Sequence, residues 1–359
     1  MGAGTAQRGA CLLISGKVRK NMEFVVFAGV LLLLFIFMIV QELIQTKNQE
    51  KLFKKYLREN YGKEPPKEYS LERFARLGSY LERHKEEKQL DDITWNDLGM
   101  DEVFRRIDRT YSAAGEEYLY YTLRNISCGR EALEHLEEVV NWLQEQENIK
   151  VRIQLLMKRL GHLGKYSLYD YLDNLDYLGE RSNRKIVLGN LLYLPFLLLL
   201  FVQPAMGTIG IVLCMLWHIM TYFREKKVIE PYIISFAYVL RLIDVCEELE
   251  KQKIPVYRRE LDELREVLKS LRELRRGAYW VMAGNQGKIG GNPLDILADY
   301  LRMILHLDIF QFNRMLEKLR KKTGQVETML AITGYLDMAI SVGGFRKSLE
   351  GYCIPKLEE

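Results

Sequence analysis

One glycine-rich loop combines residue types that could bind phosphate. The loop runs from Gly284 to Pro293 and contains Gly287-Lys288. A Walker A loop needs GxxxxGK followed by Ser or Thr, because that hydroxyl binds magnesium. Here Ile289 follows the lysine, and the first glycine, Gly284, lies three positions before Gly287 instead of five. We therefore interpret the loop as a connection between helices.

A basic helix is the second candidate, because its side chains could neutralise phosphates. Its candidate nucleic-acid contacts are Arg258, Arg259, Arg265 and Arg272. Acidic residues are interleaved with these arginines, namely Glu260, Asp262, Glu263, Glu266 and Glu273. Such spacing is typical of a solvated helix face with i,i+4 pairs. Both interpretations stay open at this point, with the solvated face favoured.

Metal and nucleophile patterns are missing from the sequence. The five cysteines are scattered and form no CxxC pair, and the five histidines form no HExxH or HxH spacing. Closer, paired spacing is what a zinc site or disulfide framework needs. We therefore expect reduced cytosolic thiols and predict no catalytic, cofactor-binding or metal residues, and no enzyme activity, in this chain. The cysteines are Cys11, Cys128, Cys214, Cys246 and Cys353.

The elements that would position these residues are organised around three apolar spans. Between Glu23 and Glu42 lie 18 uncharged residues, 24–41, which predict an uncleaved membrane anchor. From Ile186 to Phe223 the chain has 38 uncharged residues, too many for one span and about right for two. Residues 203–208 contain Pro204 and Gly207, which suit a tight reversal. We therefore predict a transmembrane hairpin with helices at about 186–203 and 207–223.

Basic residues set the expected topology. They flank both outer ends of the hairpin and are missing from its turn, so both ends should be cytosolic. The N-terminus should then lie outside, although its tail is basic. Translation that begins at Met22 would remove this conflict. We expect a multi-pass protein of the cell membrane with most of its mass in the cytosol.

The cytosolic segments read as helices, so the predicted fold class is all-α. Leu261, Leu264, Leu268 and Leu271 form a heptad-like seam within 256–276. A long apolar stripe predicts a helix over 294–322, and a helix rich in small residues is expected over 325–349. The predicted regions are a tail (1–23), the anchor (24–41), a stalk and linker (42–94), a first core part (95–185), the hairpin (186–223) and lever helices with the end of the core (224–359).

Two segments resemble the ends of the helical core domain of MutS-family proteins. Residues 101–120 carry Asp101, Arg109, Thr110, Gly115 and Glu116, and Thr122-Leu123-Arg124-Asn125 follows them. This is similar to the family's Arg-Thr, spacer and Gly-Glu arrangement. The second segment, 334–341 with 351–355, resembles the last core helix and its turn into the ATPase domain. Among membrane proteins, the chain is most similar to bacterial MutS-related proteins with transmembrane helices.

The resemblance implies a membrane-anchored core and lever, non-catalytic alone, which an ATPase domain in cis or in trans would drive. ATP and magnesium are expected only in that domain, since residue 359 falls where it would begin. This end suggests a truncated chain, a split gene or a frameshifted fragment. Expected partners are the lipid bilayer and a second copy of the chain, and nucleic acid is a candidate by resemblance alone.

Two other classes of function are alternatives for this chain. A helical scaffold unrelated to nucleic acid would dimerise through the heptad-like seam. A transporter would need polar or ionisable residues well inside its spans, and the candidates Asn190 and His218 both lie near the interfaces. The coding DNA beyond codon 359 separates a fragment from a complete scaffold, and Gly115→Leu should destabilise a closely packed core.

Overall fold

The computed structural model describes residues 36–41, 43–63, 69, 71–85, 88–126, 129–163, 167–272 and 293–353. These residues are helical apart from short connections, and their only strand-like feature is an isolated bridge between Gln89 and Asn125. The predicted all-helical architecture is therefore confirmed for this part of the chain. Contacts divide the chain into two units, Met1–Tyr56 and Leu57–Glu359.

The first unit contains the predicted anchor and the start of the stalk. Residues 24–35 of the anchor lie outside the described residues. Residues 36–41 are helical and expose apolar side chains such as Phe37. The chain is helical again over 43–56.

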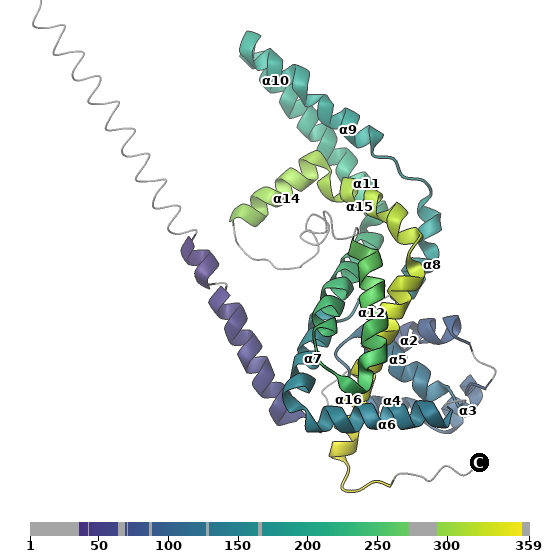
Figure 1. Cartoon of the computed structure of the whole chain (residues 1–359). Helices are drawn as coiled ribbons and strands as arrows, with labels where there is room; N and C mark the ends of the chain where they lie inside the picture. Colours follow the sequence, from purple (N-terminus) through teal and green to yellow (C-terminus); the bar gives the residue numbers. More distant parts are fainter. Residues whose placement is uncertain are drawn as a thin grey trace, which may run out of the picture. The chain divides into compact units, whose positions relative to one another are not determined.

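The second unit is a helical bundle with a projecting pair of helices (Figure 1). Its helices are α2 (Leu71–Arg83), α3 (Asp92–Asp97), α4 (Met100–Ile107), α5 (Ala113–Arg124), α6 (Arg130–Glu145), α7 (Glu147–Leu160), α8 (Leu168–Asp173), η1 (Asn174–Leu178), α9 (Arg184–Leu191), α10 (Tyr193–Val202), α11 (Pro204–Glu250), η2 (Pro255–Tyr257), α12 (Arg258–Leu271), α14 (Pro293–Leu305), α15 (Leu307–Arg320) and α16 (Thr323–Ser348).

Helix α16 is the centre of the bundle. It packs against α5, α6, α7, α11 and α12. It confirms the helix expected over 325–349, and its Met329, Leu336 and Ala339 are fully buried. By length and hydropathy α16 could cross a membrane, but 72% of its apolar window is buried inside the protein. Its apolar side chains therefore serve internal packing.

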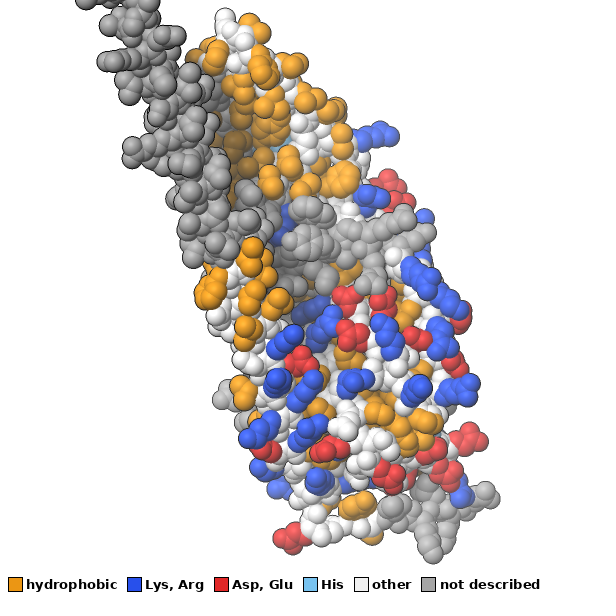
Figure 2. All heavy atoms as spheres, turned by 60° about the vertical axis from the view of Figure 1, so that its left-hand side comes forward, with side chains coloured by type: hydrophobic (Ala, Val, Ile, Leu, Met, Phe, Trp, Pro, Cys, Tyr) orange, Lys and Arg blue, Asp and Glu red, His pale blue; other side chains and the backbone are white. Residues whose placement is uncertain are grey.

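The predicted hairpin is formed by α9 and α10 on one side and the first part of α11 on the other. These two arms, Arg184–Val202 and Pro204–Glu230, are long and apolar enough to cross a membrane. None of the apolar window of the first arm is buried, and only 28% of that of the second. Figure 2 shows hydrophobic side chains gathered over this part and charged ones over the bundle. These two arms are therefore able to associate with a membrane.

Three glycine contacts define the register of the hairpin. Cβ atoms added at Gly189, Gly207 and Gly210 would meet His218, Leu200 and Phe196, respectively. Each contact pairs residues whose numbers add up to 406 or 407, as expected for two antiparallel helices in steady contact. The predicted turn was too long: Gln203 alone separates α10 from α11. Pro204 begins α11 instead of interrupting it, because a first-turn residue needs no N–H donor.

Helix α11 continues from the hairpin into the bundle. Its residues 233–249 include fully buried side chains such as Tyr238, Leu242 and Val245. The predicted boundary between residues 223 and 224 therefore falls inside one helix of 47 residues.

The heptad-like seam of α12 is occupied within the chain. Leu261, Leu264 and Leu271 are buried, and α12 packs against α11 and α16. The Tyr257 hydroxyl at its start donates to the Ile332 carbonyl of α16 at 3.1 Å. Dimerisation through this seam would have to displace these contacts.

Two sequence predictions need correction. The helix predicted over 294–322 is broken at His306, whose φ of 54° separates α14 from α15. The predicted stalk over 42–94 ends too late, because α2 packs against α5. Leu77 of α2 and Trp95 of α3 lie in one buried cluster with Phe104. Residues 64–68 of the predicted stalk and linker, and residues 284–292 of the glycine-rich loop, lie outside the described residues.

Candidate functional site

The two segments that resemble the MutS core meet at the start of α5. Helix α4 ends at Ile107, and residues 108–112 form a short connection to α5. Asp108 shapes this connection by accepting hydrogen bonds from the Thr110 amide at 3.0 Å and the Thr110 hydroxyl at 2.5 Å. Ser112 then caps α5 by accepting from the Gly115 amide at 3.1 Å. Such local side-chain bonds compete with helix formation and favour a turn here.

Asp337 of α16 binds the same connection from the far end of the chain. Its carboxylate accepts from the Tyr111 amide at 3.0 Å, the Ser112 amide at 2.8 Å and the Ser112 hydroxyl at 2.6 Å. A carboxylate at a helix N-terminus also interacts favourably with the helix dipole. Asp337 is 1% exposed, so these charge-assisted bonds are made away from water.

Ser341 extends this contact by one helical turn. Its hydroxyl accepts from the Arg109 amide at 2.7 Å and donates to the Ile107 carbonyl at 2.7 Å. The Arg109 guanidinium reaches the Ser348 hydroxyl near the end of α16 at 3.2 Å. Arg109 thus connects the α4–α5 turn to the last turns of α16.

Two glycines permit the close approach of α5 and α16. A Cβ atom added at Gly115 would lie 2.6 Å from the Asp337 Cβ. One added at Gly334 would lie 2.6 Å from the Ala114 carbonyl oxygen. Side chains at either position would force the helices apart, so the Asp337 contacts depend on both glycines.

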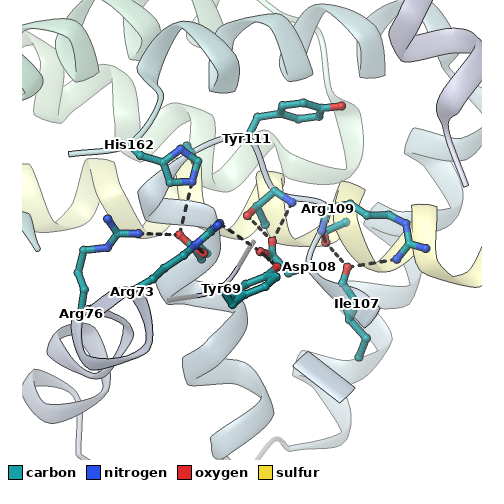
Figure 3. Close-up of polar contacts among 12 residues, drawn as sticks. Tyr69, Arg73, Arg76, Ile107, Asp108, Arg109, Tyr111 and His162 are labelled. Atoms are coloured by element: carbon teal, nitrogen blue, oxygen red, sulfur yellow. Dashed lines mark hydrogen bonds and ion pairs between the residues drawn. The ribbon is translucent and has the colours of Figure 1, made fainter. Parts of the chain in front are cut away.

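Glu116 joins α2 to this arrangement. Its carboxylate pairs with Arg73, with Arg76 at 3.0 Å and with His162 at 3.4 Å. Burial opposes ionisation of Glu116, but the hydrogen bond from His162 and the charge of Arg73 lower its pKa below the ordinary value. The Tyr69 hydroxyl donates to Asp108 at 2.5 Å. Figure 3 shows these side chains converging between α2 and the α4–α5 turn.

The pKa of the neighbouring Glu117 is shifted in the opposite direction. Glu117 is 3% exposed and accepts a hydrogen bond from the Ser167 hydroxyl at 3.1 Å. Burial raises its pKa to about 8. Glu116 and Glu117 are therefore adjacent carboxyls, one ionised and one protonated at neutral pH. Paired carboxyls with divergent pKa values also occur in active sites. Here Glu116 and Asp108 are fully buried, and the geometry fits a positioning role for them.

The structure does not bring all predicted site residues together. Arg109, Thr110, Gly115 and Glu116 belong to the arrangement described above. Asp101 lies apart from it and accepts from the Trp95 indole N–H at 2.7 Å.

The arginines predicted as candidate nucleic-acid contacts lie on the exposed face of α12. Arg265 pairs with Glu250 at 2.6 Å and Asp262 at 2.9 Å. Arg258 lies 3.8 Å from Asp262. Arg259 is exposed on the same helix, and Arg272 is exposed directly after its last residue, Leu271. These pairs agree with the predicted solvated face.

Sequence reasoning missed Arg73, Arg76, His162, Glu117 and the role of Asp337. Asp337 and Ser341 lie in the second of the two resembling segments, and their i,i+4 spacing places both side chains on one helix face. That spacing could have nominated them as a pair. The i,i+3 spacing of Arg73 and Arg76 gave only an amphipathic signal.

Two polar residues of the hairpin, Asn190 and His218, bind the α14–α15 corner. The Asn190 amide donates to the Leu305 carbonyl at 3.1 Å, and His218 Nδ1 donates to the Ile304 carbonyl at 2.8 Å. Carbonyls at a helix C-terminus lack intrahelical partners, so these side chains cap α14. Both side chains therefore have a structural use.

The described residues contain no group of three or more His, Cys, Asp or Glu side chains that could hold a metal ion. Cys214 and Cys246 are buried thiols, and Cys353 is exposed. No protein-family model, curated protein or solved structure matches this chain.

Proposed function

We propose that this chain is a membrane-tethered core and lever module that resembles the MutS core and is non-catalytic alone. An ATPase domain, in cis or in trans, would supply the nucleotide-driven movement. The observation that carries the proposal is the contact between the two resembling segments. Asp337 and Ser341 of one bind residues 107–112 of the other across more than two hundred residues of sequence.

Helix α11 would be the lever. At 47 residues it is about 70 Å long, enough to reach from the tip of the hairpin to the centre of the bundle. Pro231 lies where the apolar arm gives way to the buried part. Proline has no N–H to bond to the carbonyl four residues earlier, so this position is the natural bending point of the lever.

The hairpin would tether the lever to the cell membrane. Arg184 and Lys185 lie close to the level of Arg224, because Arg181, just before the first arm, pairs with Glu225 of the second arm. Gln203 lies eighteen positions beyond Lys185, about 27 Å along a helix, which matches the hydrocarbon thickness of a bilayer. Basic residues at one end support a multi-pass topology with the bundle in the cytosol.

A membrane-anchored scaffold is the alternative, with homodimerisation as its function. The seam of α12 packs internally, so a dimer would use another surface. Nucleic acid stays a candidate partner of the lever form only, and the paired arginines of α12 lend it little support. No binding of DNA to the reconstituted chain at low salt would remove that candidate.

The test uses the chain in lipid nanodiscs, with Cys11 and Cys128 replaced by serine and a fluorophore on exposed Cys353. A MutS-type ATPase domain is added, taken from the coding DNA beyond codon 359 or from a separate gene. We expect the fluorescence to change with ATP and the domain together, but not with either alone. A Gly334→Leu chain is the control, because the close contact between α5 and α16 is lost.

No binding and no ATP-dependent signal from a folded, membrane-inserted chain would contradict the lever proposal. A chain that gives no ATP-dependent signal but forms a stable dimer in sedimentation equilibrium would favour the scaffold.

A further inference from the structure

Helix α14 runs across the direction of the hairpin and away from it (Figure 1). It packs against α11, and its C-terminal end is fixed by Asn190 and His218. Its direction relative to the hairpin is therefore set at one end by two hydrogen bonds from different arms.

The level of this attachment follows from the register of the hairpin. Asn190 lies five residues beyond Lys185, and His218 lies six residues before Arg224. At the rise of an α-helix, Asn190 and His218 therefore lie about 8 to 9 Å closer to the hairpin tip than the basic residues at the hairpin base. Interfacial helices bury their apolar face about 5 to 10 Å into the boundary between headgroups and acyl chains. The end of α14 is thus at the depth of such helices.

The side chains of α14 suit this depth. Tyr300 is 55% exposed and Leu301 is 43% exposed. In the sequence, apolar residues recur at 294, 297, 301 and 304, the spacing of one helix face. Arg302 is 4% exposed and pairs with Asp299 at 2.8 Å, so its charge is not left alone in an apolar setting.

We propose that α14 lies in the plane of the cytosolic membrane interface and binds the lipid surface through the face that contains Tyr300 and Leu301. The proposal rests on the proposed function in one respect, the insertion of the hairpin into a bilayer. The charged residues Asp295 and Asp299 of α14 are acidic and do not attract anionic lipid. Insertion of the apolar face therefore has to hold α14 in place. Anionic headgroups are met by the basic residues at the base of the hairpin.

This second contact with the membrane restrains the bundle. Helix α15 follows α14 directly after His306, and Phe312 of α15 packs edge-on against Phe236 of α11 in the core. A hairpin alone leaves the bundle free to rotate about the membrane normal and to tilt. With α14 in the interface, tilting of the bundle has to lift α14 out of the lipid.

The experiment measures the depth of spin labels in vesicles of phosphatidylcholine with one-fifth phosphatidylglycerol. The full chain carries Cys11→Ser, Cys128→Ser and Cys353→Ser, and single cysteines are introduced for labelling. The test positions are Leu301→Cys and Tyr300→Cys. Leu133→Cys is the matched control on α6, because Leu133 is exposed to a similar degree as Leu301, and Leu213→Cys reports the hairpin. Accessibility to oxygen is compared with accessibility to a water-soluble nickel complex.

We expect the oxygen-to-nickel ratio at Leu301 and Tyr300 to be severalfold higher than at Leu133 and lower than at Leu213. Circular dichroism shows whether each variant is folded. Ratios at both test positions equal to that at Leu133, with Leu213 still in lipid, would overturn the proposal and leave the tether intact. A water-like ratio at Leu213 as well would overturn both the interfacial helix and the membrane tether.

Discussion

The hairpin and the α5–α16 contact use the same kinds of residue in opposite ways. In the hairpin, apolar side chains such as Phe201 face outward and glycines bring two apolar helices together. In the α5–α16 contact, polar side chains such as Asp337 and Glu116 face inward, and glycines bring a carboxylate to a helix end. The hairpin would rely on lipid for its stability, whereas the bundle carries its own apolar core and must satisfy each polar group that it buries.

Two phenylalanines give the largest expected contrast. Phe312 is fully buried against Phe236, whereas Phe201 is 89% exposed near the hairpin tip. We expect Phe312→Ala to lower the free energy of unfolding by about 3 to 5 kcal/mol, because it leaves a cavity. Phe201→Ala should change it by less than about 0.5 kcal/mol. Urea denaturation in mild detergent measures both. Equal losses would show that the hairpin packs against something other than lipid.

Asp337 tests the polar half of the comparison. Asp337→Ala removes the acceptor of two amides and one hydroxyl in a buried site, so we expect a loss of about 2 to 5 kcal/mol. Asp262→Ala is the control, since Asp262 forms exposed ion pairs worth less than about 1 kcal/mol. A loss at Asp337 no larger than that at Asp262 would mean that the contact between the two segments contributes little to stability.

Two glycines of α16 isolate the effect of close approach. Gly334→Ala places a methyl group 2.6 Å from the Ala114 carbonyl oxygen, and we expect a loss of about 1 to 3 kcal/mol. A methyl group at Gly324 meets nothing within 4 Å, so Gly324→Ala should be neutral or slightly stabilising. Melting temperatures of the two variants give the comparison. An unchanged melting temperature for Gly334→Ala would show that the helices can separate without cost.

The buried Glu117 predicts a dependence of stability on pH. Its folded-state pKa of about 8 lies above the ordinary value of 4.5, so the folded state binds more protons between these values. The contribution of Glu117 to stability therefore falls as the pH rises from about 4.5 to about 8. Glu117→Gln keeps an acceptor for Ser167 but does not titrate.

We expect Glu117→Gln to gain stability relative to the unmodified chain by at least about 1 kcal/mol between pH 5 and pH 9. Unfolding by urea at both pH values measures the difference. The control Glu102→Gln changes an exposed carboxylate and should show no such gain. A constant difference for Glu117→Gln across this range would mean that Glu117 is ionised in the folded protein.

The same contrast explains what the sequence could predict. The hairpin was predictable because composition alone distinguishes an apolar span, and the basic flanks mark its ends. The exact length of the hairpin turn was not predictable, because a proline such as Pro204 can either begin a helix or follow the end of one. The break at His306 carries no sequence signal, since the apolar stripe continues across it.

The candidate site was predictable only in part. Motifs located Gly115 and Glu116 but could not identify their partners, which come from α2, the loop after α7, and α16. Asp337 and Ser112 are separated by 225 residues, and no local pattern encodes such a pair. Leucine spacing predicted the seam of α12, but not that α11 and α16 would cover it.

The most direct test of the account is the sidedness of the hairpin tip and the bundle. Intact cells that express the chain with Cys11→Ser and Cys128→Ser are treated with a membrane-impermeant maleimide, with and without Gln203→Cys at the tip. We predict that Gln203→Cys is labelled in intact cells and that exposed Cys353 is labelled only after the cells are lysed. Labelling of Cys353 in intact cells, or protection of Gln203→Cys from labelling until lysis, would contradict the membrane-spanning hairpin with a cytosolic bundle.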